Sequence, residues 1–102
     1  MKHEWPIEHD NVYYLQKARD IIANGWCKYQ AQDWRGNYCA LGALAAATPS
    51  EKKFNELLKI LHYTMPRPFM SITNFNDSFV TIQADVIALF DRAIARAREI
   101  QK

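Results

Sequence analysis

The segment 33-DWRGNYCALG-42 decides the fold, because in it a polar turn leads directly into a run of small apolar residues. Asp33 to Asn37 carry turn chemistry, since Gly36 can take a positive φ without strain and Asp and Asn side chains bond nearby backbone groups. The run from Cys39 to Ala47 is almost wholly small and apolar, which lets a neighbouring helix approach closely. The segment therefore predicts a turn that feeds a buried central helix.

Three further helices are predicted around this segment. Asp10 can cap the first, and Gly25 suits the left-handed position that terminates it. Thr48 and Glu51 have the spacing of a capping box for the helix after the central one, and Thr81 can cap the last. Their apolar stripes are Tyr14, Leu15, Ala18, Ile21 and Ile22; Phe54, Leu57, Leu58 and Leu61; and Val86, Leu89, Phe90, Ala93, Ala97 and Ile100.

The connections are predicted from their composition. Residues 1–9 contain a Trp-Pro pair and indicate an extended arm, and residues 26–32 favour a short extended segment or hairpin. Residues 71–78 are rich in Asn, Asp and Ser, which is typical of a loop with internal order. The whole chain, residues 1–102, is predicted to be one mainly all-α domain, a compact bundle of about four helices.

Composition excludes several classes of protein. The 102 residues are 49% hydrophobic and 24% charged, a globular balance, and the net charge of +2 does not indicate a nucleic-acid partner. No apolar run approaches the roughly 20 residues that are needed to cross a bilayer, so the chain is not expected to insert into a membrane. Two cysteines and no leader-like opening indicate reduced thiols in the cytoplasm.

Cys39 is the candidate nucleophile, because the start of a helix favours a thiolate. A cysteine-dependent hydrolase or transferase would also need a base such as His62 and an orienting group such as Asp77. The competing interpretation is a core cysteine, since cysteine is among the most buried residue types. Cys27 and Cys39 lack the close spacing of metal ligands, and no phosphate-binding loop is present, so neither a metal nor a cofactor is expected.

Aromatic residues crowd the segment before the central helix. Trp34, Arg35 and Tyr38 combine rings and a cation, a mixture that anchors protein interfaces and also stacks on single-stranded nucleic acid. Trp34 is expected to be the most exposed because it falls within the turn. The competing interpretation is that some of these rings close the core.

The order of these features resembles a family of small uncharacterised proteins from bacteria and their phages. The similar residues are Gly25-Trp26, the pattern D-x-x-G-x-x-C-A-L-G-A-L from Asp33 to Leu44, and a later aromatic-Asn76-Asp77. In that family the later element is similar to Trp-Asn-Asp, whereas Phe75 stands here in place of Trp. The resemblance implies no activity, but it implies that the turn, Cys39 and Asn76-Asp77 form one unit.

The leading hypothesis is a non-enzymatic module that binds another protein through Trp34, Arg35, Tyr38, Asn76 and Asp77. The resemblance adds that it serves a phage or mobile element as an accessory or host-modulating protein. The alternative hypothesis is the cysteine-dependent enzyme with Cys39, His62 and Asp77.

Overall fold

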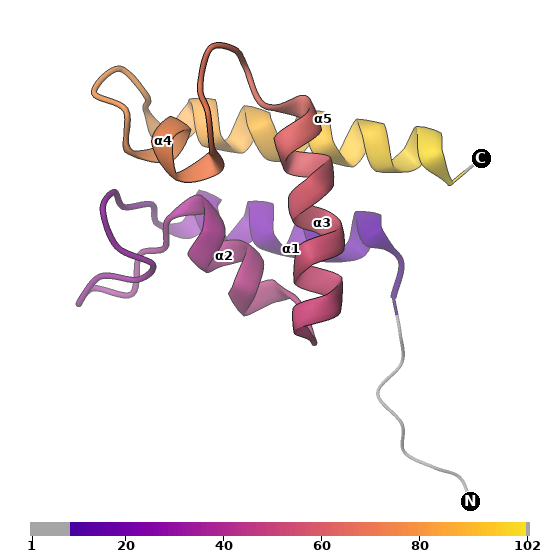
Figure 1. The fold of residues 1–102 in the computed structure, drawn as a ribbon. Coiled ribbons are helices and arrows are strands. Elements are labelled where there is room, and N and C mark those ends of the chain that lie inside the picture. Colours follow the sequence, from indigo (N-terminus) through magenta and orange to yellow (C-terminus); the bar gives the residue numbers. More distant parts are fainter. Residues whose placement is uncertain (1–8, 102) are drawn as a thin grey trace, which may run out of the picture.

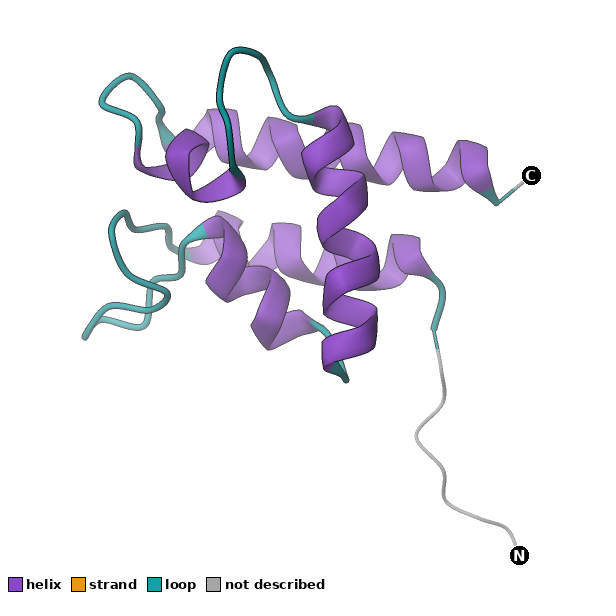
Figure 2. Cartoon of the chain, viewed as in Figure 1, coloured by secondary structure: helices purple, strands orange, loops and turns teal. Residues whose placement is uncertain are grey.

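The computed structural model describes residues 9–101. Within these residues the helices are α1 (Asn11–Asn24), α2 (Ala40–Ala47), α3 (Glu51–Thr64), α4 (Ile72–Asp77) and α5 (Gln83–Ile100). Helices α1 and α5 lie side by side and antiparallel, and α2, α3 and α4 cover one side of the pair (Figure 1). The loop between α1 and α2 and the connection from α4 to α5 lie at the same end of the bundle (Figure 2). The predicted mainly all-α bundle is confirmed. The predicted arm of residues 1–9 lies outside the described residues, except for His9.

The core lies where α1, α2, α3 and α5 meet. Each large apolar side chain buried there stabilises the fold by about 1.5–3 kcal/mol relative to an exposed one. The large apolar side chains that are fully buried are Leu15, Ile22, Leu44, Leu57, Leu61, Val86, Leu89 and Phe90. All of them belong to the predicted apolar stripes or to the central helix. The period of 3.6 residues therefore identified the buried faces of α1, α3 and α5, and the apolar composition of residues 39–47 identified α2 as the buried central helix.

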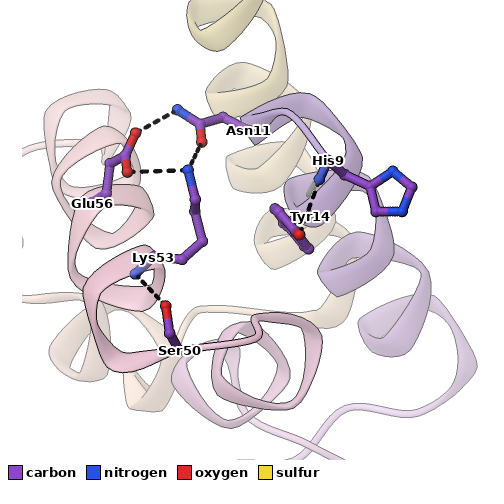
Figure 3. A network of polar contacts seen from close by, with 6 residues as sticks. All are labelled: His9, Asn11, Tyr14, Ser50, Lys53 and Glu56. Atoms are coloured by element: carbon purple, nitrogen blue, oxygen red, sulfur yellow. Dashed lines mark hydrogen bonds and ion pairs between the residues drawn. The ribbon is translucent and has the colours of Figure 1, made fainter. Parts of the chain in front are cut away.

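Polar contacts join α1 to α3 at the edge of this core (Figure 3). The ammonium group of Lys53 donates to Asn11 Oδ1 at 2.8 Å and to Glu56 Oε1 at 3.1 Å. Asn11 Nδ2 in turn donates to Glu56 Oε2 at 3.1 Å. The hydrogen bond from Asn11, together with Lys53, lowers the pKa of the Glu56 carboxyl group. The network holds the start of α1 against the first turns of α3.

Two predicted caps are wrong by one or two residues. The N-cap of α3 is Ser50, whose Oγ accepts from the N–H of Lys53 at 3.1 Å. Thr48 is instead the C-cap of α2, and its hydroxyl donates to the Leu44 carbonyl at 2.9 Å. Thr81 is buried, and α5 begins after Ile82, whose N–H donates to the Asp85 carboxylate at 2.9 Å.

Other predictions fail where tertiary contacts override local pattern. Within the predicted loop, residues 72–77 form the short helix α4, which Asn76 and Asp77 bind to the 26–39 loop and which the Ser71 hydroxyl caps by accepting from the N–H of Asn74. Residues 26–38 form an irregular loop with isolated bridges in place of a regular hairpin. Gly25 is extended, with φ of 163°, rather than left-handed. Ile100 is 57% exposed in the last turn of α5, and Ile94 joins the core instead.

Gly42 is required by a close approach between α2 and the preceding loop. A Cβ at this position would lie 2.9 Å from the carbonyl carbon of Ala31 and closer still to its oxygen. That oxygen cannot easily withdraw, because it accepts a hydrogen bond from the N–H of Cys39 at 3.1 Å. The small residue at 42 therefore lets the loop lie directly on α2.

Gly42→Ala should destabilise the protein by about 1–3 kcal/mol, because the added methyl group overpacks a backbone contact. Helix propensity alone predicts the opposite sign, since alanine is favoured over glycine by about 1 kcal/mol inside a helix. Urea unfolding measures the change. Ala45→Gly, at an exposed position of the same helix, is the control and should cost about 1 kcal/mol. A Gly42→Ala variant more stable than the wild type would contradict the close approach.

Candidate functional site

Asn76 is a buried polar residue that joins three separate segments. Only 1% of it is exposed. Its Oδ1 accepts from Trp26 Nε1 at 2.7 Å and from the N–H of Ala40 at 3.0 Å. Its Nδ2 donates to the Cys27 carbonyl at 3.1 Å and to Asp77 Oδ1 at 2.8 Å. Both donors and both acceptor positions of the amide are therefore filled, and one side chain ties α4 to the 26–39 loop and to the start of α2.

Asp77 fixes the same loop at a second point. Its Oδ1 also accepts from the N–H of Tyr29 at 2.9 Å. Tyr29 has a φ of 76°, a left-handed conformation that costs a residue with a side chain roughly 1–2 kcal/mol. Next to it, the ammonium group of Lys28 donates to the Ser78 carbonyl at 2.6 Å. The contacts with α4 thus hold the loop in a conformation that its own backbone disfavours.

The turn at residues 33–37 is closed by one carboxylate. Asp33 Oδ1 accepts from the N–H groups of Arg35 and Asn37 at 3.0 and 2.9 Å, and Oδ2 accepts from Asn37 Nδ2 at 3.0 Å. These bonds, that from the Asn37 side chain above all, lower the pKa of Asp33. Gly36 has a φ of 84°, so the predicted turn chemistry is confirmed. The closed turn leaves Trp34 86% exposed, as predicted.

The two thiols have different environments. Cys39 is the N-cap of α2, as the sequence predicts, and its Sγ accepts from the N–H of Gly42 at 3.3 Å. It is half-buried and so does not belong to the core. Cys27 donates its thiol to the carbonyls of Asn37 and Gln30 at 3.4 and 3.5 Å. Burial raises the pKa of Cys27, and the nearby Asp33 carboxylate raises it further, which disfavours the thiolate.

A cavity of about 260 Å³ lies between the loop, α2 and α4. Its walls are formed by Tyr29, Gln30, Ala31, Cys39, Leu41, Thr73, Asn76 and Asp77. The structure therefore brings together Cys39, Asn76 and Asp77. His62 lies elsewhere: it is exposed near the end of α3, its Nε2 is 3.3 Å from the Met70 carbonyl oxygen, and it lines a different cavity. None of the histidines among residues 9–101 lines the cavity that contains Cys39.

The other predicted contact residues fall into two groups. Trp34 and Arg35 are exposed, and the Arg35 guanidinium lies 4.8 Å from the centre of the Trp34 ring. Tyr38 is half-buried and packs on the core, and the buried Asn76 is a positioning residue with almost no surface to offer. Sequence reasoning missed Phe79, which is 96% exposed, and its exposed neighbour Val80. The sequence signal that could have identified them is a pair of bulky apolar residues directly after the segment 71–78, which is rich in turn-forming residues.

Among residues 9–101, no three His, Cys, Asp or Glu side chains gather closely enough to hold a metal ion. In the same part of the chain, every helix is too short or too polar to cross a bilayer.

A family model described as a family of unknown function, DUF6197, matches residues 10–96. The chain belongs to this family. The match begins at the cap of α1 and extends into α5, so it contains the 26–39 loop, Cys39 and Asn76-Asp77 together. Neither curated proteins nor solved structures provide a match.

Asn76→Ala should destabilise the protein by about 3 kcal/mol or more. The substitution leaves the N–H of Ala40 and the Trp26 indole N–H without acceptors, and each buried group left unsatisfied costs about 1–3 kcal/mol. Chemical denaturation measures the loss.

Asn74→Ala is the matched control, because Asn74 is exposed on the same helix. Its Oδ1 accepts only the Ser71 hydroxyl within the described chain, so the change should cost less than about 1 kcal/mol. Equal losses of stability in Asn76→Ala and Asn74→Ala would contradict the role of Asn76 in joining the three segments.

Proposed function

We propose that the chain is a small non-enzymatic protein-interaction module whose contact surface centres on Trp34. The observation that supports this is a large aromatic side chain, 86% exposed, on a turn that Asp33 holds closed. Large exposed rings on preorganised turns are effective anchors, because little conformational freedom is lost when they are buried by a partner. Arg35, stacked beside the ring, adds a second residue type that is enriched at interfaces.

Further exposed apolar side chains support the same end of the molecule as the contact surface. Tyr29 is 77% exposed in the loop, and Phe79 and Val80 lie in the connection from α4 to α5. The bond from Lys28 to the Ser78 carbonyl brings these two connections together. Both lie at the end of the bundle away from the C-terminus (Figure 1).

The setting of the module is part of the proposal. We infer an accessory or host-modulating protein of a phage or mobile element, and this inference rests on the motif resemblance. A cytoplasmic location is supported by the two cysteines, which form no disulfide with each other.

The cysteine-dependent enzyme has weaker support. Cys39 and Asp77 line one cavity, which favours it, but His62 lines another. A thiol nucleophile needs its base within hydrogen-bond reach or one water away. The geometry therefore supports the interaction module better.

Trp34→Ala should abolish capture of the partner from a lysate of the organism that encodes the chain. The free energy of unfolding should change by less than about 0.5 kcal/mol, because the ring is exposed in the free protein. Affinity capture with mass spectrometry, together with thermal unfolding, measures the two effects.

Tyr63→Ala is the control, since Tyr63 is 69% exposed near the end of α3, outside the proposed surface. This variant should retain the partner. Retention of the partner by Trp34→Ala, or a large loss of stability in that variant, would contradict the proposal.

A further inference from the structure

The cavity beside Cys39 carries one negative charge. Asp77 is the carboxylate among its lining residues, and no lining residue is a lysine, arginine or histidine. We propose that this cavity receives the ammonium or guanidinium group of a lysine or arginine side chain. The inference rests on the proposed interaction function, since it assigns that side chain to the partner protein.

The Asp77 carboxylate retains capacity for a ligand. Both hydrogen bonds that it accepts within residues 9–101 reach Oδ1, one from Tyr29 and one from Asn76. No cationic side chain in this part of the chain forms an ion pair with it. Lys28, on the same loop, directs its ammonium group to the Ser78 carbonyl and the Trp26 ring. A half-buried carboxylate without a counter-ion favours the approach of a cation.

The other walls suit the stem of a long basic side chain. Leu41 and Ala31 provide apolar surface against which methylene groups can pack. Tyr29, which is 77% exposed, also lines the cavity, and the face of an aromatic ring can attract a cation. A volume of about 260 Å³ is below the roughly 300–1,000 Å³ of sites for drug-sized ligands, so it suits one side chain better than a larger molecule.

The start of α2 also borders the cavity, and a helix N-terminus favours anions over cations. It carries the equivalent of about half a positive charge, which is less than the full charge of Asp77. Two of its N–H groups are already satisfied: that of Ala40 by Asn76 Oδ1, and that of Gly42 by Cys39 Sγ. The balance of charge therefore favours a cation.

The test uses N-acetyl-lysine methylamide and N-acetyl-arginine methylamide as probes, titrated into the full chain and followed by amide NMR. We expect saturable shifts at Tyr29, Cys39 and Asp77. Asp77→Asn should weaken binding about tenfold, the effect of removing a charge-assisted hydrogen bond. The new amide oxygen can still accept from the N–H of Tyr29, so the loop should keep its place. N-acetyl-norleucine methylamide, which lacks the charge, should not saturate.

Asp20→Asn is the matched control, since it removes the same charge from an exposed position outside the cavity and should change affinity less than twofold. If Asp77→Asn fails to fold, the salt dependence of the wild type decides. Binding to the carboxylate should weaken as the salt concentration rises, because the charges are screened. Absence of saturable shifts, equal affinity for Asp77→Asn, or binding independent of salt would each overturn the inference.

Partner capture distinguishes this inference from the function on which it rests. If the interaction function and the binding of a basic side chain in the cavity are both right, Asp77→Asn and Trp34→Ala should each lose the partner. If Asp77→Asn retains the partner and Trp34→Ala loses it, the interaction function stands and the assignment of a basic side chain is wrong. If the wild type captures no partner but binds both probes, the cation site stands and the interaction function is wrong.

Discussion

The buried amide of Asn76 is the constraint on which the rest of the candidate site depends. Its four hydrogen bonds reach the indole and the backbone of the 26–39 loop, the first turn of α2 and the neighbouring Asp77. A buried polar group is costly unless it is satisfied, and a satisfied network specifies one arrangement of its members. Because Asn76 lies 50 and 49 residues after its loop partners Trp26 and Cys27 and 36 residues after Ala40, this one side chain joins segments that are distant in sequence into a single unit.

Several features of the surface follow from this unit. The loop can hold Tyr29 at a positive φ because α4 accepts its N–H and binds Lys28 beside it. The same loop lies on α2 through Gly42, where a side chain would not fit. Trp34 is consequently presented on a turn whose base is anchored at several points. A rigid base favours recognition, because the ordering of a flexible loop would otherwise oppose binding.

The fold was predictable from sequence to the extent that it depends on local periodicity. The stripes around Leu15, Leu57 and Phe90 identified the buried faces, and the turn at Asp33 and the helix start at Cys39 were read from residue types. The helix α4 was not predicted, because a six-residue segment rich in Asn and Asp has weak propensity and gains its stability from tertiary contacts. The hydrogen-bond partners of Asn76 were not predicted for a different reason. A sequence does not reveal which distant groups will fill the bonds of an amide, so the residue was interpreted as a contact when it is a support.

The most direct test of this account is native-state hydrogen exchange at the amides of Cys27, Tyr29, Cys39 and Ala40. Their acceptors are the Tyr38 carbonyl, Asp77, the Ala31 carbonyl and Asn76, which together span the loop, α2 and α4. If Asn76 makes one cooperative unit of these segments, the four amides should exchange with a common opening free energy. Rapid exchange at Cys27 and Tyr29 while Ala40 stays protected would contradict the account, because the loop would then open independently of α2.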